Sequence, residues 1–268
     1  MIDAYTESRV RQISRRKRLL SPASVNRELA TLRRLLRLAK KRKVITSVPE
    51  IKLLDGEHER EFVLNAQTEK LYLATVAEWL KNLSVFMLDT GARMKEALGL
   101  EWPNVHLQPA PGANLGYVKI VWQTSKRAKS RNVPLTARVV EMLRSLGPEK
   151  AGYVFHRADG SPLCQTWVNQ QHADARKFLR LPEEFVPHTF RHTYGTRLGE
   201  AGADAFTIMR LMGHASVTVS QRYVHPTPET LERAVERLQQ LNQGSGTEAQ
   251  KVPQEFPKGK NDQANILQ

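Results

Sequence analysis

The chain reads HTFRH at residues 188–192, GH at residues 213–214 and RYVH at residues 222–225. Together with Arg93 upstream, these stretches supply guanidinium groups, imidazoles and one phenol. His188 and Arg191 are three residues apart, so on a helix they lie on one face and reach the same anion. This combination suits attack on a phosphodiester, because the cations offset the charge of the anion and the imidazoles carry protons.

The residues around His188 do not indicate a metal or a cofactor. His188 and His192 have the spacing of two ligands on a helix, but no glutamate follows His188 and Cys164 offers no second ligand cluster. Asp89 and Glu96 do not form the carboxylate pair that a metal-dependent nuclease requires. We therefore expect no bound metal and no cofactor, and we interpret His192 as a packed histidine bonded to backbone.

Composition points to a partner that is a polyanion. The chain has 268 residues, a formal net charge of +14 and 40% hydrophobic residues, enough for one or two cores. Its apolar runs are interrupted by Lys or Glu and fall short of the roughly 20 residues of a membrane span. Without an apolar leader, and with Cys164 as the single cysteine, the chain is expected to be cytoplasmic and to have no membrane partner.

Most of the net charge lies at the N-terminal end. Residues 1–46 hold 14 basic residues against three acidic ones, a net +11. Apolar residues recur there at helical spacing from Val25 to Ala39, and Ser21-Pro22 is suited to starting that helix. We interpret the helix as a phosphate-binding element, with a merely solvated helix as the alternative. Residues 47–61, rich in charged residues and containing Pro49 and Gly56, are interpreted as a linker.

The remaining pattern predicts a mainly α (α+β) fold, in which a small antiparallel β-sheet lies inside a mostly helical domain at residues 62–243. Residues 117–122 alternate and are followed, after a Lys-rich turn, by 131–135, which predicts a β-hairpin; Val154-Phe155 is suited to a third strand. Residues 244–268 have little to bury and are expected to be a disordered tail. Helices are expected at 66–80, 83–88, 93–98, 137–146, 167–179, 189–200, 205–212 and 228–241.

Four motifs occur in a fixed order along this domain. They are TGAR at residues 90–93, HTFRH at 188–192, LMGH at 211–214 and YVH at 223–225. In order and spacing, including nine residues from His214 to Tyr223, they resemble the phage integrase, or tyrosine recombinase, family. The resemblance covers roughly residues 62–240. In isolation, Tyr223 would be read as a half-buried aromatic and His214 as a helix-terminal residue.

The resemblance implies a role for each matching residue. Arg93 and Arg191 correspond to the arginines that hold the non-bridging oxygens of the scissile phosphate, and His214 adds a hydrogen bond there. His188 corresponds to the histidine that handles protons, and Tyr223 to the nucleophile.

The family also has a catalytic lysine on a mobile β-hairpin. Lys126, five residues before Arg131, is the best match, while Lys129 and Arg127 remain alternatives.

By resemblance, the chain is a site-specific recombinase that cleaves and rejoins double-stranded DNA through a 3′-phosphotyrosyl link, without metal or ATP. A homo-tetramer on DNA, accessory DNA-bending or directionality proteins and a mobile element as its source are implied in the same way. Residues 228–241 either dock on a neighbouring protomer or pack on their own domain. The DNA target site, and whether integration or excision prevails, do not follow from the sequence.

Residues 1–46 are shorter than the four-helix, SAM-like core-DNA-binding domain of the family, so they are expected to be a partial, truncated form of it. Two alternative functions therefore stay open. One is a type IB topoisomerase, which uses the same chemistry without a preferred site. The other is a truncated integrase that retains only DNA binding.

Overall fold

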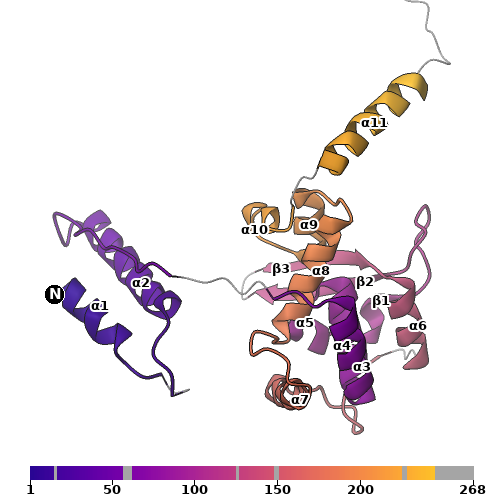
Figure 1. Ribbon diagram of the computed structural model, residues 1–268, viewed down its shortest axis with the longest axis horizontal. Coiled ribbons are helices and arrows are strands. Elements are labelled where there is room, and N and C mark those ends of the chain that lie inside the picture. The colour runs from indigo at the N-terminus through magenta and orange to yellow at the C-terminus, as the bar shows by residue number, and fades with distance from the viewer. Residues whose placement is uncertain (15–16, 57–61, 125–126, 148–150, 225–227, 245–268) are drawn as a thin grey trace, which may run out of the picture. The chain divides into compact units, whose positions relative to one another are not determined.

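The computed structural model describes residues 1–14, 17–56, 62–124, 127–147, 151–224 and 228–244. The chain forms two compact units, Met1–Phe62 and Val63–Gln268 (Figure 1). None of the helices in the described ranges combines the length and the hydropathy that crossing a membrane requires.

The first unit is a pair of helices, α1 (Ile2–Val10) and α2 (Pro22–Lys41). The Ser21 side chain caps α2 by accepting a hydrogen bond from the Ser24 N–H at 3.3 Å, and Pro22 occupies the first turn, as predicted. Val25 and Leu29 are fully buried and form the core of the unit with Ile51. A core this small leaves the opposite face of α2 to solvent. That face carries Arg27, Arg34, Arg37, Lys40 and Lys41.

Residues after α2 pack back onto it. The Asn26 side chain donates to the Leu54 carbonyl and accepts from the Leu54 N–H, each at 2.8 Å. The Arg33 guanidinium donates to the Ile51 carbonyl. Since Asn26 is buried, this pairing fixes residues 51–54, part of the segment interpreted as a linker, against the helix. Residues 57–61 of that segment lie outside the described residues.

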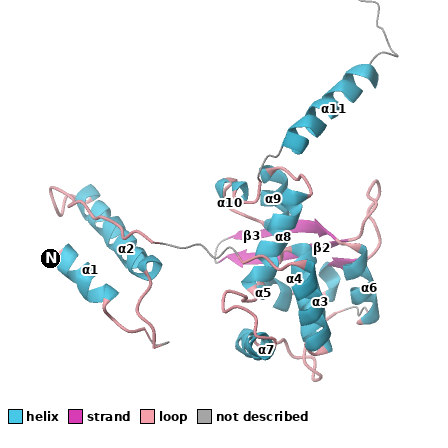
Figure 2. Ribbon diagram, viewed as in Figure 1, coloured by secondary structure: helices cyan, strands magenta, loops and turns pink. Residues whose placement is uncertain are grey.

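The second unit is mostly helical and contains one three-stranded antiparallel sheet, which confirms the predicted fold class (Figure 2). Its strands are β1 (Val105–His106), β2 (Tyr117–Thr124) and β3 (Arg127–Pro134), in the order β1-β2-β3. Its helices are α3 (Ala66–Thr75), α4 (Glu78–Thr90), α5 (Met94–Leu98), α6 (Ala137–Ser145), α7 (Gln165–Phe178), α8 (His188–Glu200), α9 (Ala205–Met212), α10 (Thr218–Gln221) and α11 (Pro228–Gly244). The predicted tail at 245–268 lies outside the described residues.

Helix α4 lies at the centre of this unit. Every residue from Asn82 to Leu88 is buried, and the helix packs against α3, α5, α6 and α8. Its C-terminal end at Thr90 is followed directly by the loop that carries Arg93. The buried helix therefore delivers that loop to the side of α8.

Two predicted elements differ from the structure. The third strand is Val105–His106, paired with Tyr117 and Val118, and not Val154-Phe155. The residues on either side form isolated bridges, Tyr153 to Glu101 and His156 to Pro162. Val154 and Phe155 are buried, so their apolar character reflects core packing of a loop and not a strand. The predicted helix at 66–80 is also interrupted.

The interruption falls at Val76 and Ala77, both of which are extended and separate α3 from α4. The apolar run continues through this break because Leu80 and the residues after it are buried in α4. Hydrophobic content alone therefore does not reveal it. Helices α1 and α10 were not predicted.

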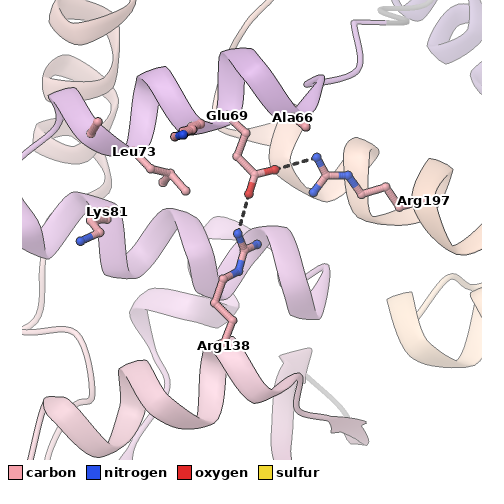
Figure 3. A pocket seen from close by; sticks show the side chains of 8 residues that line it. Ala66, Glu69, Leu73, Lys81, Arg138 and Arg197 are labelled. Atoms are coloured by element: carbon pink, nitrogen blue, oxygen red, sulfur yellow. Dashed lines mark hydrogen bonds and ion pairs between the residues drawn. The ribbon is translucent and has the colours of Figure 1, made fainter.

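A buried carboxylate joins three helices of the second unit. Glu69 on α3 accepts from Arg138 on α6 and from Arg197 on α8, each at 2.6 Å (Figure 3). Arg138 also donates to Asp89, near the end of α4, with its Nε at 3.1 Å. These ion pairs fix α8, which carries Arg191, relative to the end of α4, which is followed by the loop that carries Arg93.

We expect Glu69→Gln to destabilise the second unit by about 1–2 kcal/mol, because two arginines lose their shared carboxylate while their half-exposed positions limit the cost. The four tryptophans of the chain all belong to this unit, so tryptophan fluorescence in a denaturant titration reports it alone. Glu78→Gln is the matched control, since it removes only the exposed Glu78–Lys81 pair. Equal unfolding midpoints for the two variants would contradict the role given to Glu69.

Candidate active site

Two arginines that are far apart in the sequence meet at the C-terminal end of α9. The Arg191 guanidinium, on α8, donates to the Gly91 carbonyl at 2.5 Å and to the Met212 carbonyl at 2.6 Å. The Arg93 guanidinium donates to the carbonyl of the next residue, Gly213, at 3.3 Å. Because the two acceptors belong to adjacent residues, the guanidinium groups of Arg93 and Arg191 converge on one place.

Glycines at two helix ends make this approach feasible. Gly91 ends α4 with φ +62° and Gly213 ends α9 with φ +67°, in the left-handed region where a Cβ is unfavourable. A Cβ at Gly91 would lie 2.4 Å from the Tyr194 ring, and one at Gly213 would lie 2.7 Å from an Arg131 nitrogen. Larger residues at either position would displace the groups that surround the arginines.

Glu96 and Arg131 complete the cluster, and neither was among the predicted site residues. The Glu96 carboxylate accepts from the Arg93 side chain at 2.9 Å and from Arg131 at 2.7 and 3.1 Å. Arg131 also donates to the Leu211 carbonyl at 2.8 Å, which joins β3 to α9. Glu96 lies three positions after Arg93 at the start of a helix, and this spacing was a sequence signal for the contact between Arg93 and Glu96.

Burial alone raises the pKa of Glu96, but the hydrogen bonds and charge of Arg131 and the hydrogen bonds of Arg93 outweigh it and lower that pKa to about 2. Burial lowers the pKa of Arg191 to about 9, and the charges of Arg93 and Arg131 act in the same direction. At neutral pH the carboxylate and the guanidinium are both charged. One carboxylate thus faces three guanidinium groups, which leaves positive charge for an anion to neutralise.

His214 follows Gly213 and lies beside the arginines. Its Nδ1 is 2.7 Å from the hydroxyl oxygen of Ser220, a fully buried residue that was not predicted as part of the site. Burial lowers the pKa of His214 to about 4, and the charges of Arg191 and Arg93 add to the effect. The imidazole is therefore neutral at pH 7 and offers a hydrogen bond without a charge.

Tyr223 packs against α8 next to this cluster. Its side chain is 8% exposed, and its ring is nearly parallel to that of His214, with ring centroids 6.3 Å apart. A Cβ at Gly195 would lie 2.8 Å from the phenol ring, and one at Gly199 would overlap the Tyr223 carbonyl. The small residues on α8 thus admit the tyrosine.

Burial raises the pKa of the Tyr223 phenol, while the charges of Arg222 and Arg191 oppose that rise. The phenol is therefore protonated at neutral pH. His192 Nδ1 lies 3.4 Å from the phenolic oxygen, so a residue interpreted as a packed histidine also faces the tyrosine.

The other two predicted residues are placed differently. His188 is the first residue of α8 and is exposed, and its charge contributes to the lowered pKa of His214. Lys126 lies outside the described residues, as do the side chains of its alternatives, Arg127 and Lys129. Within the described ranges, no group of three or more His, Cys, Asp and Glu side chains is arranged to hold a metal ion.

A groove adjoins the cluster on the side of β3. Its volume is about 460 Å³, and it runs between β3 and the C-terminal part of α9. Ser130, Arg131, Arg210 and His214 are among the residues that line it. The positive cluster is therefore open to a ligand from this side.

The sequence and the fold both have known relatives. Tyrosine recombinase XerC of Nitrobacter winogradskyi is 36% identical over 163 residues, 57% of this chain and 48% of that protein. Tyrosine recombinase XerD of Corynebacterium glutamicum is 32% identical over 152 residues, 53% of this chain and 46% of that protein. The chain thus spans about half the length of the curated relatives it matches.

Solved structures show the same fold. The Tn1549 transposon integrase (residues 82–397), in complex with circular intermediate DNA, has a TM-score of 0.69 at 20% identity, covering 88% of this chain and 86% of that one. The XerH site-specific recombinase, bound to its difH substrate before cleavage, has a TM-score of 0.59 at 25% identity, covering 81% and 65%. The model of the phage integrase family matches residues 54–230, well over half of the sequence, and the chain therefore belongs to the phage integrase family.

Proposed function

We propose that this protein is a site-specific DNA recombinase that cleaves and rejoins double-stranded DNA through a 3′-phosphotyrosyl intermediate. The observation that carries the proposal is the convergence of Arg93, Arg191 and His214 at the end of α9, with Tyr223 packed beside them. The relatives are named tyrosine recombinases, and this supports the same activity here. Residues 62–243 are proposed to be the catalytic domain.

In this proposal the two arginines bind the non-bridging oxygens of the scissile phosphate. The Arg191 guanidinium has five N–H groups, and among the described residues only the Gly91 and Met212 carbonyls accept from it, so donors remain for an anion. In-line attack places further charge on those oxygens, which planar donor forks absorb more specifically than a lysine would. Neutral His214 adds one hydrogen bond without adding to the repulsion among the cations.

Tyr223 attacks phosphorus, and the bond from phosphorus to the 5′ oxygen breaks. The 5′ oxygen leaves as a hydroxyl once it receives a proton, and by resemblance we assign Lys126, which lies between β2 and β3 in the sequence, as the donor. By resemblance, His188 handles protons in the same site. The phosphotyrosyl bond retains the energy of the original phosphodiester, so another 5′-hydroxyl reseals the strand without ATP.

The basic face of α2 is proposed to contact the DNA backbone. It exposes Arg27, Arg34 and Arg37 with few acids nearby, and such contacts supply affinity that depends on salt. We propose that residues 1–46 are part of a core-DNA-binding domain. We expect the protein to act in the cytoplasm, together with accessory DNA-bending or directionality proteins.

Assembly of several copies on DNA is proposed to use α11. Leu231, Val235, Leu238 and Leu241 recur at helical spacing, and each is between 56% and 69% exposed. A stripe of this kind is stabilised when another apolar surface covers it. We propose that a neighbouring protomer in a tetramer provides that surface.

Tyr223→Phe should abolish the covalent protein–DNA adduct, because it removes only the nucleophilic oxygen. The substrate is a pool of nicked duplexes with a randomised core. Cleavage near the nick releases a short strand that diffuses away, so the break cannot be resealed and the enzyme stays covalently attached to the DNA. Adducts are counted on denaturing gels, and the sequences that wild type captures define a suicide substrate. An adduct of equal yield in the variant would remove Tyr223 as nucleophile.

Arg191→Ala should slow cleavage by about 10²-fold or more while duplex affinity changes little, because α2 supplies most of that affinity. Arg191→Lys should recover little, since it lacks the planar fork. The double variant Arg34→Ala/Arg37→Ala is the converse control: its affinity should fall and its salt slope should decrease by about 2. A loss of affinity with Arg191→Ala as large as in that control would contradict this division of roles.

Leu238→Glu should prevent assembly on a duplex that carries two binding sites, because it places a charge within the apolar stripe of α11. Light scattering after size-exclusion chromatography measures the mass of the complex. Glu236→Gln, an exposed position on the same helix, is the control. If Leu238→Glu forms complexes of wild-type mass, α11 does not mediate assembly.

A further inference from the structure

The imidazole of His192 is the one described side chain that forms a hydrogen bond to the Tyr223 phenol. Its Nδ1 is 3.4 Å from the phenolic oxygen, and the two rings are tilted by 50° with centroids 5.4 Å apart. His192 follows Arg191 on α8 and is half-buried. It therefore holds the nucleophile from the same helix that supplies a phosphate-binding arginine.

The other neighbours of the phenol have different functions. Gly195 and Met212 pack against the phenol ring, and the Nδ1 of His214 is hydrogen-bonded to the hydroxyl group of Ser220. His188 is four residues before His192 and is exposed at the start of α8. Of the three histidines that the structure describes around the site, His192 has the direct contact with the oxygen that must lose a proton.

We propose that His192 aligns the phenol of Tyr223 and accepts its proton during strand cleavage. This inference rests on the proposed recombinase function. As the Tyr223 oxygen bonds to phosphorus, its O–H bond breaks and the proton moves to Nδ1 of His192. The bond from phosphorus to the 5′ oxygen breaks at the same time, and its electron pair leaves on that oxygen. For Nδ1 to accept, the neutral ring carries its hydrogen on Nε2.

The surrounding charges favour the same step. Arg191, the preceding residue of α8, and Arg222, whose guanidinium carbon lies 6.0 Å from the centroid of the Tyr223 ring, both stabilise a developing phenolate. Burial opposes ionisation and leaves the pKa of the phenol raised overall. A nearby acceptor is thus needed because the cations alone do not release the proton.

In the resealing step the transfer reverses. His192 returns its proton to the phenolic oxygen as a 5′-hydroxyl attacks the phosphotyrosyl bond. His188, exposed at the start of α8, is then left to handle protons on the side of the phosphate and the leaving strand. Of the two histidines in HTFRH, His192 therefore acts on the nucleophile and His188 acts on the DNA.

The test compares single-turnover cleavage of the suicide substrate by wild type, His192→Ala and His192→Asn. His192→Ala should be about 10²-fold slower at unchanged duplex affinity. His192→Asn still accepts a hydrogen bond but cannot take a proton, so it should remain roughly tenfold slower than wild type. Thr196→Ala, on the next turn of α8, is the matched control and should keep the wild-type rate.

A second substrate shows on which side of the phosphate His192 acts. A sulfur atom in place of the bridging 5′ oxygen leaves without protonation, so it should rescue a variant that lacks the general acid, Lys126→Ala. It should not rescue His192→Ala, because the phenol still has to lose its proton.

Rescue of His192→Ala by sulfur would overturn the proposal, and so would wild-type cleavage by either His192 variant. If wild type forms an adduct and Tyr223→Phe does not, such a result refutes the His192 inference alone. If wild type forms no adduct with any nicked duplex of the pool, the recombinase function itself fails.

Discussion

The candidate site depends on one buried guanidinium group. Arg191 is 2% exposed, and an arginine at that depth needs a partner for its charge and for each N–H that water no longer reaches. It donates to the carbonyl groups of Gly91 and Met212, and no carboxylate in the described part of the chain forms an ion pair with it. Because these two carbonyl groups accept hydrogen bonds without cancelling the charge, the positive potential of Arg191 stays available to an anionic ligand.

Glu96 makes this arrangement stable before a ligand binds. Through Arg93 and Arg131 it links the loop after α4 to β3, while Arg131 reaches the end of α9. Glu69 performs a similar task further out, between α3, α6 and α8. The two carboxylates hold the segments that bear Arg93 and Arg191, so the spacing of the guanidinium groups is set by the fold and not by the ligand.

Local signals in the sequence predicted the helices and the hairpin well. Ser21-Pro22 starts α2 as its capping chemistry requires, and the alternation at residues 117–122 forms β2. The contact of Glu96 with Arg131 spans 35 residues, and no local pattern reports it. The third strand was misplaced for a related reason, because Val154 and Phe155 are apolar owing to burial in a loop.

Some residues of the candidate site were likewise predictable from local sequence, whereas others are identified only by the tertiary structure. Motif order singled out Arg93, Arg191 and His214, which the fold does bring to the end of α9. The partnership of His192 with Tyr223 joins residues 31 positions apart and appears only when α8 and the segment after α10 are packed together. A histidine next to a motif arginine has no pattern of its own that would distinguish packing from proton transfer.

The charges of Glu96, His214 and Arg191 change little around pH 7. The pKa of Glu96 is lowered to about 2 and that of His214 to about 4, while that of Arg191, lowered to about 9, still lies above neutrality. Glu96 favours the folded state above the ordinary carboxyl pKa, and this contribution is lost as pH falls toward 2. His214 is half-buried and neutral in the folded chain, so the unfolded chain binds a proton first and stability decreases below the ordinary histidine pKa. Both effects lower the stability of the folded chain only at acidic pH. Neither changes the charge of the cluster between pH 7 and 8. A change in cleavage rate within that interval therefore does not report Glu96 or His214, and it points to the groups proposed to move protons to and from the phenol and the 5′ oxygen.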